Sequence, residues 1–260
     1  MMIKKIMLIL VVMAFSPLVY AVKVDSLYQA EVFVVSQTGD AKEQAAKEGL
    51  LQVLIKISGD PYIDRRPLIR SVLRKAEYYV SDYYYLPTTK DASQYVLRIS
   101  YEREDVNRLL KQAKIAYWGD NRPLIFVWLV VTNVQHMTDI ISTEAPGDVY
   151  TNLLHEANKY GLPFIFPMLD VSEVNLVSAH DVMATSEILK VMAKRYSPEA
   201  ILIGDITEGD NNAQSKWQLI LDSHKWEWVI NESTTDAVLE SVVKQVNQVV
   251  MTKIKSASYA

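Results

Sequence analysis

An uninterrupted apolar run at residues 124–131, which reads Leu-Ile-Phe-Val-Trp-Leu-Val-Val, sets the strongest limit on the fold of this chain. A strand in which apolar and polar residues do not alternate is usually covered on both faces, most often by helices. Residues 200–206 are predicted to form a second strand of this buried type. Helical spacing of apolar residues predicts helices at 148–160 and 179–196, and a short strand is predicted at 162–169. This part of the chain therefore favours an α/β arrangement.

The end of the chain predicts a hairpin followed by a helix. Trp217, Leu219 and Leu221 alternate with more polar neighbours, and Trp226 begins a second alternating stretch after a tight turn at 223–224. Alternation of this kind is typical of antiparallel strands with one buried face. The valine-rich stretch 238–250 has a period near 3.6 and is expected to pack on the hairpin. Residues 123–260 thus predict the order β-α-β-α-β-β-β-α.

The first half predicts a separate unit. Its order is β-α-α-β-β-α over residues 22–117, and the polar turn at 118–123 is the expected domain boundary. The predicted fold class is α/β with α+β elements, in two small mixed-sheet units. The elements of the first unit are strands at 24–35, 79–86 and 94–101 and helices at 41–57, 67–78 and 104–115.

The first 21 residues have the pattern of a secretory signal. Lys4 and Lys5 precede an apolar run at 6–15, and cleavage is expected after Ala21, so that Val22 becomes the first mature residue. The apolar run is about half as long as a spanning helix requires, which favours cleavage, although a retained membrane anchor is the alternative. We expect a periplasmic protein without a stable membrane span after processing.

Composition limits the chemistry. Without Lys4 and Lys5 the mature chain has 25 basic and 31 acidic residues. An acidic protein of this kind is a poor candidate for nucleic-acid binding, which depends on basic surfaces. The chain contains no cysteine, so disulfides, thiolate catalysis, cysteine-ligated zinc and a thioether-linked lipid are excluded. No metal or other cofactor is predicted, because the four histidines stand in no recognised ligand pattern.

A weak ligand-binding site is predicted from four polar residues. Asp170 follows the strand predicted at 162–169, and His180 and Asp181 follow soon after. Asp205 follows the apolar residues of the strand predicted at 200–206. Ligands of open α/β sheets bind beyond the carboxyl ends of strands. The alternatives are a helix cap for Asp181 or its neighbours and a strand-terminating turn for Asp205.

Two other groups of residues have open interpretations. The first is a tyrosine cluster that is either a glycan or peptide platform or an ordinary strand with tyrosines on alternating faces. The second is basic: Arg65 and Arg66 form one short pair and Arg122 stands alone, which is too little for a polyanion site. The tyrosines are Tyr78, Tyr79, Tyr83, Tyr84 and Tyr85.

Several stretches resemble an exported proteobacterial family of unknown function, catalogued as domain of unknown function twenty sixty-six. They are Trp118-Gly119 with Arg122-Pro123 and the strand that follows, the opening at 24–32, the helix end at 51–59, and 162–170. Phe33 departs from the pattern, where a small residue or proline is expected. The resemblance implies export and this layout but no reaction. At the level of fold alone, the strand and alanine-rich helix are similar to modules of periplasmic assembly proteins.

Two functional hypotheses follow. The first is a non-enzymatic periplasmic module that binds an envelope protein or assists envelope assembly, because no catalytic motif is present. The second is a periplasmic small-ligand binder or hydrolase that uses Asp170, His180, Asp181 and Asp205. The two differ in whether these four side chains converge in one pocket.

Overall fold

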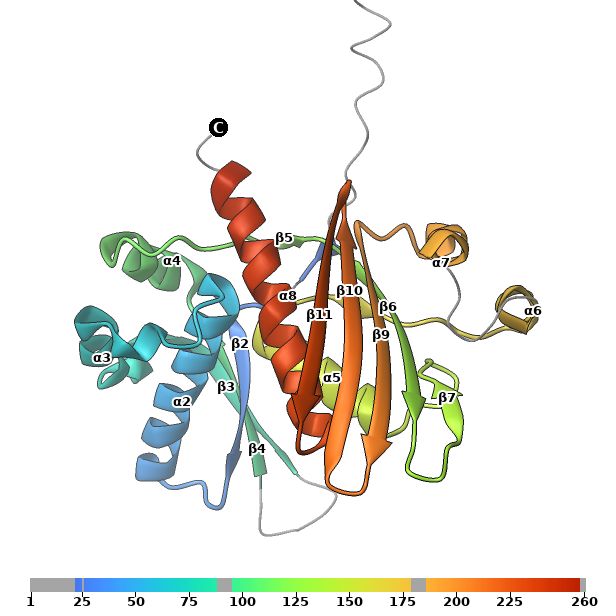
Figure 1. Cartoon of the computed structure of the whole chain (residues 1–260). Helices are drawn as coiled ribbons and strands as arrows, with labels where there is room; N and C mark the ends of the chain where they lie inside the picture. Colours follow the sequence, from blue (N-terminus) through green and yellow to red (C-terminus); the bar gives the residue numbers. More distant parts are fainter. Residues whose placement is uncertain (1–21, 25, 88–94, 179–185, 258–260) are drawn as a thin grey trace, which may run out of the picture.

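The computed structural model of the chain describes residues 22–24, 26–87, 95–178 and 186–257. Its strands form a three-stranded sheet, a six-stranded sheet and a two-stranded ribbon, which helices accompany (Figure 1). The predicted class, mixed α and β elements with mixed sheets, is confirmed. The predicted signal segment, residues 1–21, lies outside the described residues.

The three-stranded sheet is antiparallel, in the order β2-β4-β3. Exposed and buried residues alternate along β2, because only one sheet face packs against helix α2. Residues 26–28 form a turn, so β2 begins later than the predicted residue 24. The strands are β2 (Gln29–Val34), β3 (Val80–Pro87) and β4 (Tyr95–Tyr101).

Three α-helices and two short 3₁₀ turns complete this part, and the predicted order β-α-α-β-β-α is confirmed. Helix α2 ends where Gly59 adopts a left-handed conformation with φ of 67° and donates its N–H to the carbonyl of Ile55. Glycine suits this position because it lacks a Cβ. The elements are α2 (Gly39–Ser58), α3 (Pro67–Leu73), α4 (Arg103–Gln112) and the turns Ile63–Arg65 and Ala76–Tyr79.

The six-stranded sheet has the order β11-β10-β9-β6-β7, with β8 beside β6. Strands β6 and β9, the two predicted apolar runs, lie parallel to each other. Strands β9, β10 and β11 form an antiparallel meander. The strands are β6 (Ile125–Thr132), β7 (Thr138–Ile140), β8 (Phe164–Ile165), β9 (Ala200–Gly209), β10 (Asn212–Leu221) and β11 (His224–Glu232).

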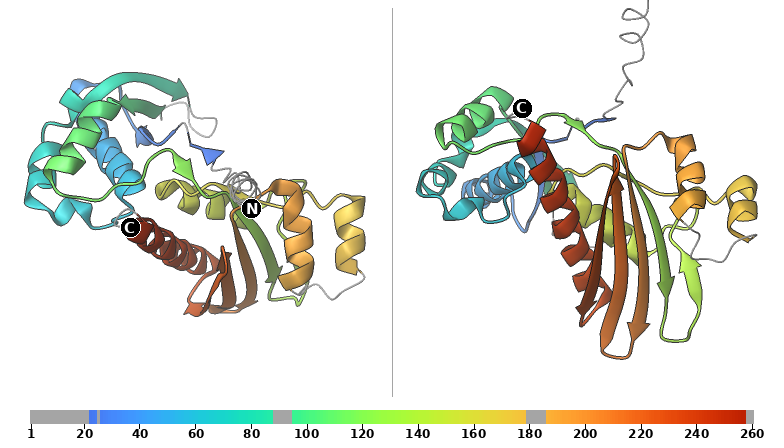
Figure 2. Two further views of the ribbon diagram at one scale, coloured as in Figure 1. Left: turned by 90° about the horizontal axis from the view of Figure 1, so that it is seen from above. Right: turned by 45° about the horizontal axis from the view of Figure 1, so that its top comes forward.

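Helices cover the two faces of this sheet unequally. Helices α5 (Asp148–Lys159) and α8 (Thr235–Ala257) lie on one face, and the valines of α8 pack there against Trp217. Helix α7 (Ser186–Ala193) contributes Leu189 and Met192 to a smaller cluster on the other face, over β6 and β9. Figures 1 and 2 show α7 beside β6 and β9, away from β10 and β11. Strand β6 is buried on both faces, as its apolar run predicts.

Five details of the second unit were predicted wrongly or missed. The strand predicted at 162–169 forms only over β8, because Pro163 and Pro167 cannot donate to a ladder. Strand β7 and helix α6 (Val171–Ser178) were not predicted. Strand β9 continues past residue 206, since its polar end pairs with β10. The hairpin turn lies at 222–223, one residue earlier than predicted. Of the helix predicted at 179–196, residues 179–185 lie outside the described residues.

Arg122 connects the ends of helices α2 and α5. It lies in β5 (Asn121–Arg122), which pairs with β1 (Val22–Lys23). Its guanidinium is fully buried and donates to the carbonyls of Lys56 at 2.9 Å, Tyr160 at 2.6 Å and Gly161 at 3.2 Å. These carbonyls belong to the ends of α2 and α5, where helices leave acceptors unsatisfied. Arg122 therefore has a structural role, and the division into two domains at 118–123 stays a prediction.

Candidate functional site

A shallow depression of about 410 Å³ lies on the six-stranded sheet, over β9, β10 and β11. Alternate residues of β10 are buried under α8, and the residues between them face the opposite side. Helix α7 lies over β6 and β9 on that side and reaches Ile220 of β10, and among the described residues no helix lies over β11 there (Figures 1 and 2). The depression is lined by Ile203, Gly204, Asp205, Lys216, Trp217, Gln218, Glu227, Trp228 and Val229.

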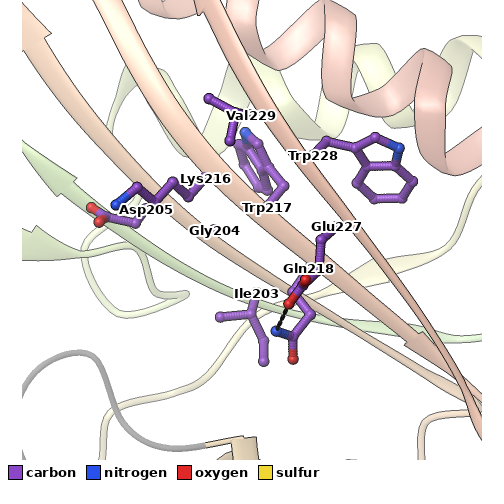
Figure 3. Close-up of a pocket in the computed structure, with 9 residues that line it drawn as sticks. All are labelled: Ile203, Gly204, Asp205, Lys216, Trp217, Gln218, Glu227, Trp228 and Val229. Carbon is purple, nitrogen blue, oxygen red and sulfur yellow. Dashed lines mark hydrogen bonds between the residues drawn. The ribbon is translucent and has the colours of Figure 1, made fainter.

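Charged and amide side chains meet in this depression because strand register places them opposite one another. Asp205 pairs with Lys216, and their side chains point toward each other in Figure 3. Gln218 pairs with Glu227 on the next strand, and its Nε2 donates to the carboxylate at 3.2 Å. Directly opposite residues of an antiparallel pair lie on the same face. The result is a charge-balanced surface with an apolar patch at Val229, which is 70% exposed.

Glu227 is held in its ionised form. The ammonium of Lys225 lies 2.8 Å from its carboxylate, and this hydrogen bond and charge lower the pKa of Glu227. A carboxylate with a lowered pKa is a poor proton donor at neutral pH. The depression therefore offers fixed charges and hydrogen-bonding groups, which suit recognition of a polar surface.

The floor of the depression is rigid. Gly204 leaves space on the inner face for the indole ring of Trp217, which lies opposite it in the register. The indole N–H donates to Ser215 Oγ at 2.9 Å, and that hydroxyl donates to the carbonyl of Ile230 at 3.0 Å. Three strands are thereby fixed relative to one another beneath the charged side chains.

The structure places Asp205 and Asp170 in different surroundings. Asp205 lines the depression, but it lies inside β9, so its predicted position at the end of a strand is wrong. Asp170 begins helix α6, where its Oδ1 accepts hydrogen bonds from the N–H groups of Ser172 and Glu173. Its Oδ2 is paired with Arg195 at 2.5 Å. No contact joins Asp170 to Asp205 among the described residues, and a shared ligand-binding role stays a prediction.

Asp170 belongs to a network that fixes the start of α6. The hydroxyl of Ser172 donates to it at 2.6 Å, and this bond and the one from Arg195 lower the pKa of the Asp170 carboxyl. The neighbouring carboxylate of Glu173 is buried and accepts hydrogen bonds from the hydroxyl of Tyr196 at 2.6 Å and the N–H of Leu169 at 2.7 Å. These contacts are those of a helix cap.

The other predicted positions lie outside the described residues or have structural surroundings. His180, Asp181 and Ala21 lie outside the described residues, and Val22 is in strand β1. Among the residues that the structure describes, no three side chains of the metal-binding types come together. In the same residues no helix has the length and apolar character needed to span a membrane.

The tyrosine cluster follows ordinary strand alternation. The rings of Tyr83 and Tyr85 lie 6.2 Å apart on one face of β3, in an edge-to-face arrangement. Tyr84 points to the other face, where its hydroxyl accepts a hydrogen bond from Arg98 at 2.7 Å. Arg98 also forms an ion pair with Glu31. Two tyrosine faces are therefore present, and neither gathers the whole cluster into one platform.

Sequence reasoning missed Lys216, Gln218, Glu227 and Val229. A signal for them was present, because the predicted hairpin assigned Trp217, Leu219, Trp226 and Trp228 to the buried face. Alternation then directs the residues between them to the opposite face. What the sequence lacked was the position of α7, which lies over β6 and β9 and not over β11.

Comparisons with known proteins give a family match for the first part of the chain. Residues 21–119 match the model of a family described as Domain of unknown function (DUF8605). The expectation of an uncharacterised family agrees with this match, but the number differs from the one that the resemblance suggested. A proteobacterial origin stays a prediction. No curated protein matches the chain.

Three solved structures show limited similarity. The LpoB C-terminal domain from Salmonella enterica is 12% identical, with 43% of this chain and 83% of that chain covered and a TM-score of 0.28. Lipoprotein GNA1162 from Neisseria meningitidis is 11% identical, with coverages of 48% and 96% and a TM-score of 0.27. A competence or damage-inducible protein from Enterobacter asburiae is 10% identical, with coverages of 51% and 87% and a TM-score of 0.28. Similarity at this level carries no inference about function.

Proposed function

We propose that this chain is an exported periplasmic protein that binds an envelope protein without catalysing a reaction, and that the depression on β9, β10 and β11 holds the partner. The open, charge-balanced character of this sheet face is the observation that carries the proposal. The export half of the proposal rests on the predicted signal at residues 1–21.

The shape of the depression supports a macromolecular partner. Its residues come from three adjacent strands, and among the described residues helix α7 lies over the β9 side of this face and no helix lies over β11. Small-molecule sites are usually concave and bury most of the ligand. Protein interfaces instead combine an apolar centre with a polar rim, and Val229 lies beside Lys216 and Glu227 in this way.

The charges support recognition of a surface with both signs. Lys216 and Asp205 lie on one side of the depression, and Glu227 with Lys225 lies on the other. Charges at such a surface favour a complementary partner and disfavour a surface with the wrong sign at each position. Reversing one of them is therefore expected to weaken binding of a complementary partner.

Site-specific crosslinking in cells tests the proposal. A photo-crosslinking amino acid at Val229 is expected to give a reproducible adduct to another protein, which its mass distinguishes from any adduct to a second copy of this chain. Substitution Lys216→Glu is expected to remove this adduct, because it places two acids together at Asp205. The matched control Lys111→Glu changes an exposed lysine on α4 and is expected to leave the adduct unchanged.

Three outcomes would contradict the proposal. They are the absence of any adduct to another protein, an adduct that survives Lys216→Glu in a folded variant, and a mature chain that is found in the cytosol with residues 1–21 attached. Thermal unfolding of each variant shows that it is folded, and amino-terminal sequencing shows where processing occurs.

A further inference from the structure

We propose that strand β11 pairs antiparallel with β11 of a second copy of this chain, so that two six-stranded sheets join into one. Strand β11 is the outermost strand of its sheet, and its pairing within the described residues is with β10. An edge strand presents unpaired N–H and C=O groups, which are a template for another strand. This inference does not depend on the function proposed above.

Side-chain contacts or an irregularity interrupt the other long edge strands, whereas β11 is continuous. On β2, the carbonyl of Gln29 accepts a hydrogen bond from the Lys56 ammonium at 2.9 Å, and the carbonyl of Glu31 accepts one from the Gln52 amide at 3.4 Å. On β3 the register with β4 shifts between Val80 and Asp82, an irregularity that disrupts an edge. Strand β11 has nine residues and keeps a continuous register with β10.

The turn before β11 determines which backbone groups point outward. A two-residue turn joins Leu221 to His224, and the residues that flank such a turn form a hydrogen-bonded pair. Hydrogen-bonded and non-hydrogen-bonded pairs then alternate along the hairpin. The N–H and C=O groups that face away from β10 are therefore those of Lys225, Glu227, Val229 and Asn231.

The sequence of β11 suits pairing with itself. When all nine residues pair about a two-fold axis, Trp228 lies on the axis and Trp226 faces Ile230 of the other copy. Glu227 then faces Val229, Lys225 faces Asn231, and His224 faces Glu232. No like charges lie directly opposite, and aromatic and β-branched pairs are favourable. A shift of the two-fold axis from Trp228 to Glu227 would instead place Glu227 directly opposite Glu227.

Space is available beside this edge. A groove of about 320 Å³ separates Trp226 from helix α8. Alternate side chains of an added strand point to the α8 side of the sheet, so this groove can receive them. Its remaining lining is mostly amide and hydroxyl side chains with one apolar residue: Gln245, Gln248, Val249, Thr252 and Lys253.

The mass of the purified chain in solution, measured over a range of concentrations, tests the inference. We expect twice the monomer mass at high concentration. Substitution Glu227→Pro removes one outward N–H while leaving the β10 ladder intact, and it is expected to abolish the dimer. The matched control Glu227→Ala loses the same side chain but keeps the N–H, and it is expected to remain dimeric.

A second measurement covers the case in which the proline variant fails to fold. The chain has no cysteine, so Glu227→Cys and Val229→Cys each introduce a single thiol. Mild oxidation of the mixed variants is expected to give a disulfide between the two different chains in greater yield than either variant gives alone.

A monomer at every concentration would overturn the inference. So would a dimer that survives Glu227→Pro in a folded protein, or a mixture without the mixed disulfide, because each would mean that another surface joins the copies. Crosslinking to an envelope partner at Val229 can succeed whether or not the dimer forms, so failure of one proposal is distinguishable from failure of the other.

Discussion

The indole ring of Trp217 occupies the space that a side chain on Gly204 would fill. A Cβ at Gly204 would have three atoms of the Trp217 ring within 2.7 Å. The two residues lie opposite each other in adjacent strands, and Trp217 is 2% exposed. This contact lies directly beneath the depression, so the shape of the proposed binding surface depends on it.

Substitution Gly204→Ala is expected to destabilise the protein, because the added methyl group has to displace the buried indole ring of Trp217. Overpacking of this kind typically costs about 1–3 kcal/mol. Urea unfolding followed by circular dichroism measures the change. Gly119→Ala is the matched control, since a Cβ there meets nothing within 4 Å. Equal stabilities for the two variants would contradict the packing.

Lys56 is expected to make the stability of the folded protein depend on pH in the alkaline range. Burial, with repulsion from Arg122, lowers the pKa of its ammonium from the ordinary 10.5 to about 8. Between these values the unfolded chain binds more protons than the folded chain. The free energy of unfolding therefore rises with pH in this window.

Urea unfolding at intervals between pH 8 and pH 10.5 tests this expectation. The stability of the natural chain is expected to increase relative to that of Lys56→Met as the pH rises. Lys47→Met, at an exposed position of the same helix, serves as the control. A constant difference between the natural chain and Lys56→Met would show that Lys56 is not the source.

Asn247 is expected to stabilise the contact between the two parts of the chain. Its side-chain N–H donates to the carbonyl of Gly59 at 2.8 Å, which links α8 to the end of α2. Asn247 is 4% exposed. Asn247→Ala leaves that carbonyl without its partner, and an unsatisfied buried group costs about 1–3 kcal/mol. Gln248→Ala, at the exposed neighbouring position, is expected to have little effect in the same unfolding measurement.

Asp170 is expected to hold the first turn of α6 in a pH-dependent way. Hydrogen bonds from Ser172 and Arg195 lower its pKa in the folded protein from the ordinary 3.8. Its stabilising effect is therefore complete above pH 3.8 and is lost as the pH falls through the folded value. Hydrogen exchange at the amides of Ser172 and Glu173 should be faster in Asp170→Ala at neutral pH, because alanine has no side-chain oxygen to accept their hydrogen bonds. Asp139→Ala on β7 is the control, and unchanged exchange in Asp170→Ala would contradict the cap.

The sequence alone determined the longer helices and strands and which of their faces are buried, but not β7 or α6. The apolar run of β6 predicted a strand covered on both faces, and alternation in β10 and β11 predicted a hairpin with Trp217 inside. These patterns are local consequences of side-chain period, because a strand repeats every two residues and a helix every 3.6. The same local information could not show where β9 ends, since its polar tip is stabilised by pairing with β10.

Only the tertiary structure decided which polar residues lie together. Asp205 and Glu227 are 22 positions apart in the chain and line one depression because β10 lies between their strands. Asp170, which stood with Asp205 in the prediction, begins a helix and pairs with Arg195. Strand order and the placement of α7 depend on how complete elements pack, and no short stretch of sequence contains that information. The elements therefore follow from local periodicity, and the candidate surface follows from their assembly.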